Sequence, residues 1–311
     1  MAVNTQIWTK EFSKNLFEVA DWYSVGLNHS KYVNGATVHI PQAVVNTDLQ
    51  PVAIGASQSY PVAIKEVGYS DLTYNNKMIA SPPRFVEDLI TAEASFSTRK
   101  VEMEAMISYM KQAMNIEIAD KWATIATSSL VRTTGTTTRS NIYGMASVKR
   151  LLFQDILDAR IKIIRETKGN YGTLYLVVDP VMQTDILKMT EFTSSDELST
   201  KIAVTGWIGQ VAGFQVIARS LGLPFEEDSV GVTKATVNYG DVHAATVFSG
   251  ALAFSSNFVS YSVSGIKLGV EPYATGYYAD VMQSHIRLGG SPVYVEASNV
   301  VKGIVSIVET T

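Results

Sequence analysis

Hydrophobic residues recur every three or four positions in three stretches of the chain, which is the spacing of one apolar face of an α-helix. In the longest stretch, residues 93–127, we expect this face to contain Val101, Ala105 and Tyr109, with a row of methionines beside it. Neither Gly nor Pro interrupts the stretch, so it predicts one helix of about 45 Å at 1.5 Å per residue. A second helix is predicted over residues 152–166.

The third stretch lies near the N-terminus. Trp8, Phe12, Leu16 and Tyr23 fall on one apolar stripe, and Trp22 adjoins it. Large aromatic side chains on a terminal helix need a partner that covers them. Two interpretations stay open, because the stripe can pack on the core of its own chain or dock as an arm on a neighbouring subunit. The second interpretation makes these five residues candidate interface residues.

Residues 35–88 change to the alternating pattern of extended chain. Val38 and Ile40 are separated by one polar residue, and three prolines follow at equal intervals from Pro41. This pattern predicts a long β-hairpin that projects from the rest of the molecule. A projecting hairpin has unpaired edges and poorly buried apolar faces. We therefore expect it to lie on another chain, with Val38 and Ile40 as candidate contacts.

The second half of the chain is rich in strand signals. An apolar strand at residues 174–178 stops at Asp179-Pro180, and a short helix is predicted next, over residues 181–189. Beyond it, β-branched and aromatic residues predict strands of a mixed sheet. These strands are expected at residues 214–218, 233–239, 244–248, 258–263, 266–271 and 292–296. The helices and strands together predict an α+β fold.

Composition narrows the class of protein. The chain has 311 residues, 46% of them hydrophobic and 17% charged, so it can bury a large core. It has no cysteine, which excludes disulfides, zinc–thiolate sites and thiol catalysis. The formal net charge of −4 gives no sign of a surface that seeks nucleic acid or membrane. No signal-peptide core and no membrane-spanning segment is expected.

The sequence contains no recognisable catalytic or ligand-binding motif. Its four histidines are scattered singly and lack the spacing of metal ligands. Three glycines at residues 206, 209 and 213 do not form the phosphate-binding G-x-G-x-x-G, so they favour turns or close packing. Glu226, Glu227 and Asp228 are adjacent along the chain, whereas paired catalytic carboxylates face each other across a site. They are interpreted as a solvated loop or as an interface tip, and we predict no enzyme activity, cofactor or metal.

The order of these parts resembles the major capsid proteins of tailed bacteriophages, which have the Hong Kong 97-type shell fold. The likeness covers essentially the whole chain and includes a strand with a Pro stop followed by the spacing GxxGxxxGF. By this resemblance we expect an N-terminal arm, an extended β-hairpin loop, a peripheral domain with a long spine helix, and an axial domain with a mixed sheet. The corresponding boundaries are 1–34 for the arm, 35–92 for the loop, 93–180 and 265–311 for the peripheral domain, and 181–264 for the axial domain.

The resemblance also implies a function. Such a chain would assemble with itself into pentamers and hexamers of an icosahedral head shell that encloses double-stranded DNA without reading its sequence. It would be made in the cytoplasm of a bacterial host and reside in the virion, away from membranes. A separate scaffolding protein, a portal protein and decoration proteins are expected partners. An encapsulin nanocompartment around a cargo enzyme is the alternative, and a cytosolic α/β enzyme is a remote one.

Overall fold

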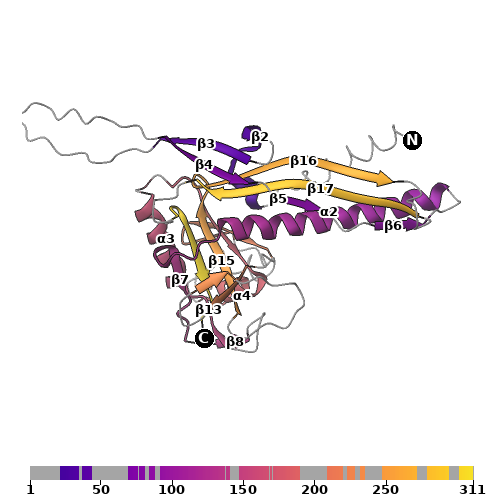
Figure 1. The fold of residues 1–311 in the computed structure, drawn as a ribbon. Helices are drawn as coiled ribbons and strands as arrows, with labels where there is room; N and C mark the ends of the chain where they lie inside the picture. Colours follow the sequence, from indigo (N-terminus) through magenta and orange to yellow (C-terminus); the bar gives the residue numbers. More distant parts are fainter. Residues whose placement is uncertain are drawn as a thin grey trace, which may run out of the picture.

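The structure is a computed structural model that describes the chain in sixteen segments. These are residues 22–34, 37–43, 69–75, 77–80, 84–87, 92–136, 138–140, 147–167, 169, 171–189, 209–219, 223–227, 232–234, 247–271, 279–293 and 301–310. Figure 1 shows that they form two parts, a long flat arm and a body that lies below one end of the arm.

The arm is a two-stranded hairpin with a helix along it. Its strands are β16 (Val259–Glu271) and β17 (Ala279–Pro292), which pair antiparallel, and the helix is α2 (Ala92–Trp122). Short strands extend the hairpin into a five-stranded sheet. They are β1 (Leu27–Asn28), β5 (Lys77–Ala80) and β6 (Arg84–Glu87). The predicted strands 258–263 and 266–271 are one strand, because β16 continues through a register shift between Ser264 and Lys267.

The 31-residue helix α2 confirms the long helix that the sequence predicts, although it ends at Trp122 rather than at 127. Its predicted apolar face is partly wrong, because Tyr109 and Ala105 are exposed. The buried face is the neighbouring row of long side chains, which repeats at helical spacing and covers more apolar area than alanine does. That row consists of Met103, Met106, Met110, Met114, Ile118 and Trp122.

The body is built on an eight-stranded mixed sheet. Its central strand is β15 (Val247–Ser255), which pairs with β10 (Leu174–Val178) and β13 (Pro224–Glu227), and with β18 (Ile304–Val308). The remaining strands are β7 (Leu130–Arg132), β11 (Gln210–Val211), β12 (Phe214–Ala218) and β14 (Val232–Lys234). Strands β10 and β12 match their predicted bounds, whereas β18 was not predicted.

Two helices cover one face of this sheet. They are α3 (Phe153–Glu166) and α4 (Pro180–Leu187), which confirm both shorter helices predicted from the sequence. Asp179 accepts a hydrogen bond from the Val181 N–H and caps α4, with Pro180 at its first turn, so the Asp-Pro pair both stops β10 and starts the helix. Ile156 and Ile163 of α3 pack on this face with Ala251 and Ala253 of β15.

Smaller elements complete the described fold. A three-stranded sheet beside the arm contains β2 (Val33–Asn34), β3 (Thr37–Ala43) and β4 (Tyr69–Asn75), and a separate hairpin contains β8 (Thr138–Ser140) and β9 (Ser147–Lys149). Three short 3-10 helices are η1 (Trp22–Val25), η2 (Ser30–Tyr32) and η3 (Thr127–Ser129). The β3–β4 ladder is the base of the predicted hairpin, whereas β5 and β6 pair with β17 instead.

The body sheet does not respect the boundaries expected between the peripheral and axial domains. Strand β10 lies in the segment assigned to the peripheral domain, and so does β18, yet both pair with β15 of the expected axial segment. Conversely, β16 begins at Val259 and belongs to the arm sheet. Strand pairing thus joins segments on either side of the expected boundaries at 180 and 264, and the division into peripheral and axial domains stays a prediction.

An aromatic cluster joins the arm to the body. The ring of Trp122, at the end of α2, lies 5.1 Å from that of Phe254 in β15 and 5.3 Å from that of Trp22 in η1. The indole Nε1 of Trp122 donates a hydrogen bond to the Ser260 carbonyl oxygen at 2.9 Å. The Trp122 side chain is fully buried. It packs against the backbone of Gly290, where a Cβ atom would lie 3.0 Å from the indole nitrogen. We refer to Trp22, Trp122 and Phe254 as the aromatic joint.

We predict that Trp122→Ala lowers the free energy of unfolding by about 3–5 kcal/mol, because it leaves a cavity at the joint and an unpaired Ser260 carbonyl. Urea denaturation of the unassembled chain measures this loss. Tyr109→Ala is the matched control on the same helix, since Tyr109 is 45% exposed and its loss should change stability by less than about 0.5 kcal/mol. Equal effects of the two substitutions would contradict the role of the joint.

Candidate functional site

The described residues hold no group that resembles a catalytic or metal site. No three His, Cys, Asp or Glu side chains among them lie close enough to hold a metal ion. No helix in the described part of the chain is both long enough and apolar enough to cross a membrane. The polar features that do stand out are a buried ion network in the body and a groove on its surface.

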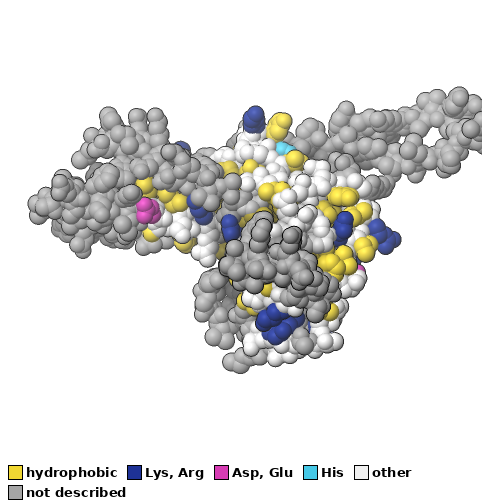
Figure 2. All heavy atoms as spheres, turned by 180° about the vertical axis from the view of Figure 1, so that it is seen from behind, with side chains coloured by type: hydrophobic (Ala, Val, Ile, Leu, Met, Phe, Trp, Pro, Cys, Tyr) yellow, Lys and Arg dark blue, Asp and Glu magenta, His cyan; other side chains and the backbone are white. Residues whose placement is uncertain are grey.

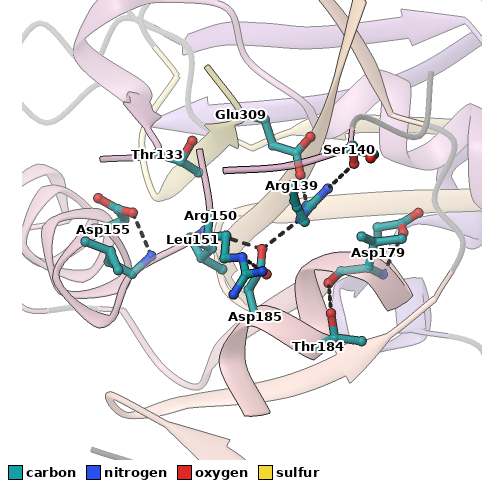
Figure 3. A network of polar contacts seen from close by, with 12 residues as sticks. Thr133, Arg139, Ser140, Arg150, Leu151, Asp155, Asp179, Thr184, Asp185 and Glu309 are labelled. Atoms are coloured by element: carbon teal, nitrogen blue, oxygen red, sulfur yellow. Dashed lines mark hydrogen bonds and ion pairs between the residues drawn. The ribbon is translucent and has the colours of Figure 1, made fainter. Parts of the chain in front are cut away.

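The buried ion network links three separate elements of the body (Figure 3). Arg139 of β8 donates from Nε to Asp185 Oδ2 of α4 at 3.0 Å, and from Nη2 to Glu309 Oε1, which follows β18. Arg150 approaches the same Asp185 carboxylate with its Nε at 3.9 Å, and the Leu151 N–H donates to it at 3.4 Å. Two arginines thus neutralise two carboxylates and fasten the β8–β9 hairpin to α4 and the C-terminal segment.

Burial sets the protonation of this network. Glu309 is fully buried, and burial raises its pKa from 4.5 to about 7. The Arg139 guanidinium opposes the rise, whereas the charge of Asp185 adds to it. Asp185 is also buried, with 3% of its surface exposed. Removing one partner would leave an unpaired buried charge, so the arrangement has the properties of a structural clamp.

A second polar cluster fixes the loop before β8. Thr134 Oγ1 donates to Asp155 Oδ1 at 2.6 Å, and the Leu152 N–H donates to Asp155 Oδ2 at 2.8 Å. Asp155 therefore satisfies the first turn of α3 and holds the threonine-rich loop against it. Thr310 Oγ1 in turn donates to the Thr133 carbonyl oxygen at 2.9 Å. These bonds hold Thr133 and Thr134 against α3 and the C-terminal segment.

The surface of the body carries a groove of about 530 Å³ between β7 and α3. Its apolar lining comes from Ile125, Leu130, Val131, Ile161 and Val232. Ile125 is 45% exposed and Ile161 is 50% exposed, which is unusual for isoleucine. In Figure 2 hydrophobic and basic side chains lie next to each other on the body.

The structure places three of the predicted interface residues in the core of this chain. Trp22 is 2% exposed and Tyr23 is 7% exposed, and both pack in the cluster that contains Trp122. Val38 of β3 is fully buried. For Trp22 and Tyr23 this supports the interpretation in which the aromatic residues pack on their own chain, since almost none of their surface remains for a neighbour.

Of the other predicted interface residues the structure describes three, and they lie in two different strands. Ile40 lies in the β3–β4 ladder opposite Leu72. Glu226 and Glu227 lie in β13, opposite Thr233 and Val232 of β14. Trp8, Phe12, Leu16 and Asp228 fall outside the described residues. An interface role for these seven residues stays a prediction.

One of the three spaced glycines has the turn role that the sequence favours. Gly213 lies in the turn between β11 and β12 with a φ of 83°, and Gly209, directly before β11, has a φ of 68°; both values favour glycine. Gly206 lies outside the described residues. The ion network was missed altogether, and its only signal in the sequence is single charges within apolar runs, as at Asp185 and Glu309.

The fold as a whole is similar to those of solved phage capsid proteins. No protein-family model matches the chain, and neither does any curated protein. The capsid of Ralstonia phage GP4 is similar with a TM-score of 0.61 at 10% identity, over 93% of this chain and 87% of that chain. The acid-stable capsid of Helicobacter pylori bacteriophage KHP30 has a TM-score of 0.55 at 10% identity, over 88% and 84%. The capsid of cyanophage P-SCSP1u has a TM-score of 0.53 at 13% identity, over 91% and 86%. The chain therefore has the Hong Kong 97-type capsid fold that its sequence resembles.

The ion network predicts a specific pH dependence. Because the pKa of Glu309 is higher in the folded chain, the folded state holds a proton that the unfolded state has lost between pH 4.5 and about 7. Stability from this group therefore falls as pH rises through that window. Glu309→Gln cannot titrate, so we expect the variant to gain stability relative to wild type between pH 5 and pH 8, by roughly 2–3 kcal/mol.

Urea denaturation of the unassembled chain at several pH values measures this difference. Asp158→Asn, which removes an exposed carboxylate from α3, is the matched control for the loss of one negative charge. A stability difference between Glu309→Gln and wild type that stayed constant from pH 5 to pH 8 would contradict the raised pKa.

Proposed function

We propose that this chain is a structural subunit of a bacteriophage capsid, and that copies of it assemble into the pentamers and hexamers of a closed icosahedral shell. The fold supports the proposal, because the similarity to phage capsid chains extends over about nine-tenths of the molecule. The ion network has a structural explanation, so the described polar clusters give no independent reason to propose an enzyme.

The observation that carries the proposal is the shape of the arm. Its 31-residue helix and its 14-residue strand are each about 46 Å long. Among the described residues only α2 covers the hairpin as a helix, so this part of the arm is a thin layer outside the body (Figure 1). Large hydrophobic side chains remain exposed on and beside it, including Tyr32 at 61% and Met78 at 59%. In a closed shell, neighbouring subunits would cover these surfaces.

The proposal extends to the contents and partners of the shell. The chain has a net charge of −4, so enclosed double-stranded DNA would be contained rather than bound in a sequence-specific manner. A separate scaffolding protein, a portal protein and decoration proteins are proposed partners. The proposed location of the chain is the shell of the virion after synthesis in the cytoplasm of a bacterial host.

Assembly of the purified chain tests this function. Sixty copies of the 33.9 kDa chain, enough for the smallest closed icosahedral shell, weigh about 2 MDa. We therefore expect light scattering and negative-stain microscopy to find uniform particles of at least that mass. Circular dichroism of the same sample establishes that the chain is folded.

A folded, monodisperse species below about 200 kDa under every assembly condition would contradict the proposal. The contents of particles from infected cells distinguish the two shell functions. Double-stranded DNA is expected inside, whereas particles that hold a cargo enzyme and no DNA would identify a nanocompartment instead.

A further inference from the structure

The groove between β7 and α3 has the chemistry of a binding surface. Strand β7 pairs with β18 on one side, and among the described residues no strand pairs with its other side. Helix α3 runs beside this edge and supplies Ile161 to the groove, and Ile125 precedes η3. A groove with two half-exposed isoleucines leaves apolar surface uncovered in the isolated chain.

The charged lining of the groove is mainly basic. Arg132, Lys162 and Arg165 contribute three cations, against the single carboxylate of Asp158. The Lys162 ammonium donates one hydrogen bond to the Leu130 carbonyl oxygen at 2.6 Å, which fixes it at the groove. An ammonium has three donors, so this geometry leaves capacity for further acceptors.

Glu166, another carboxylate of α3, does not line the groove and accepts its hydrogen bonds from other parts of the chain. The carboxylate of Glu166 accepts hydrogen bonds from Ser129 Oγ at 3.3 Å and from the Gly303 N–H at 3.3 Å. Lys162 acts on this carboxylate at longer range. Over the lining residues alone, three cations and one carboxylate give the groove a positive balance in a chain whose net charge is −4. Because the rest of the surface must be acidic on average, a second copy of the chain offers complementary charge.

The position of the groove agrees with such a contact. Strands β3 and β4 pair antiparallel, and one end of their ladder lies on the same side of the molecule as α3 (Figure 1). A neighbouring subunit that met this end of the ladder would also face α3. Both contacts would then belong to one interface.

We propose that the groove between β7 and α3 binds an acidic, partly apolar segment of a second copy of this chain. This proposal rests on the proposed shell function and names one of its contact surfaces. The isoleucines would be covered by apolar side chains of the neighbour, and Lys162 and Arg165 would pair with its carboxylates. Charge pairs of this kind mainly set the orientation and rate of association, while the apolar part holds the contact.

The absence of cysteine allows a direct test, because a single introduced thiol is unique in the chain. Ile161→Cys would be labelled with benzophenone-maleimide and irradiated before and after assembly. We expect crosslinks between two copies only in the assembled particles, with mass spectrometry locating them in an acidic peptide of the second copy. The unassembled labelled chain is the control for crosslinks within one copy.

The outcomes separate this proposal from the proposed function. If the wild-type chain forms no particles, the shell function fails. If particles form but the label at position 161 gives only crosslinks within one copy, the groove proposal fails and the shell function stands. Crosslinks to a different protein or to DNA would also overturn the second copy as the occupant.

A charge reversal supplies a second, independent readout. We expect Arg165→Glu to slow assembly at least about tenfold, measured by light scattering, because it places a negative charge against the acidic neighbour. Lys188→Glu at the end of α4 is the matched control, since it makes the same change of charge at an exposed site of the body outside the groove and away from the arm. Equal rates for Arg165→Glu and wild type, or equal slowing by both variants, would overturn the proposal.

Discussion

The rest of the structure depends on the packing of Trp122 at the junction of the arm and the body. Its indole contacts an aromatic ring from the body at Phe254 and another from the N-terminal segment at Trp22, while its N–H bonds the backbone of β16 at Ser260. One side chain thus touches parts of the chain that are far apart in sequence. Because these groups are buried and in contact with one another, they hold the arm against the body. Among the described residues, α2 is the helix that lies along the arm, and large side chains such as Met78 remain exposed on it.

The two faces of the body sheet show how this arrangement is built. Along β15, Ala251 and Ala253 face the layer of α3 and α4, whereas Leu252 and Phe254 face the cluster that contains Trp122. Small residues on one face allow helices to approach closely, and large residues on the other reach the arm. The ion network of Arg139, Asp185 and Glu309 joins β8, α4 and the segment after β18, so these polar groups also have a structural role. The apolar faces and the ion network of the body thus all have structural roles.

The sequence predicts the elements with strong local signals and misses those that depend on distant neighbours. Helix α2 is predictable because nothing interrupts its periodicity, yet its buried row of methionines is displaced from the expected face, since tertiary packing chooses among adjacent apolar rows. Strand β17 was largely missed, and the pair Gly289-Gly290 within it explains why. At Gly290 a Cβ atom would lie 2.9 Å from Ile118 Cδ1, so glycine there reflects close approach of a helix rather than a turn. The ion network and the groove were missed for the same reason, because each assembles from elements whose proximity no local pattern records.

A single-particle reconstruction of the assembled particles tests the central claim most directly, namely that neighbouring copies cover hydrophobic side chains that stay exposed in the described part of the arm. The account predicts rings of five and six copies, in which the aromatic joint is intact and the outer surface of each arm contacts a neighbouring copy. Particles in which the copies touch only through their bodies, with the arms contacting no neighbour, would contradict it.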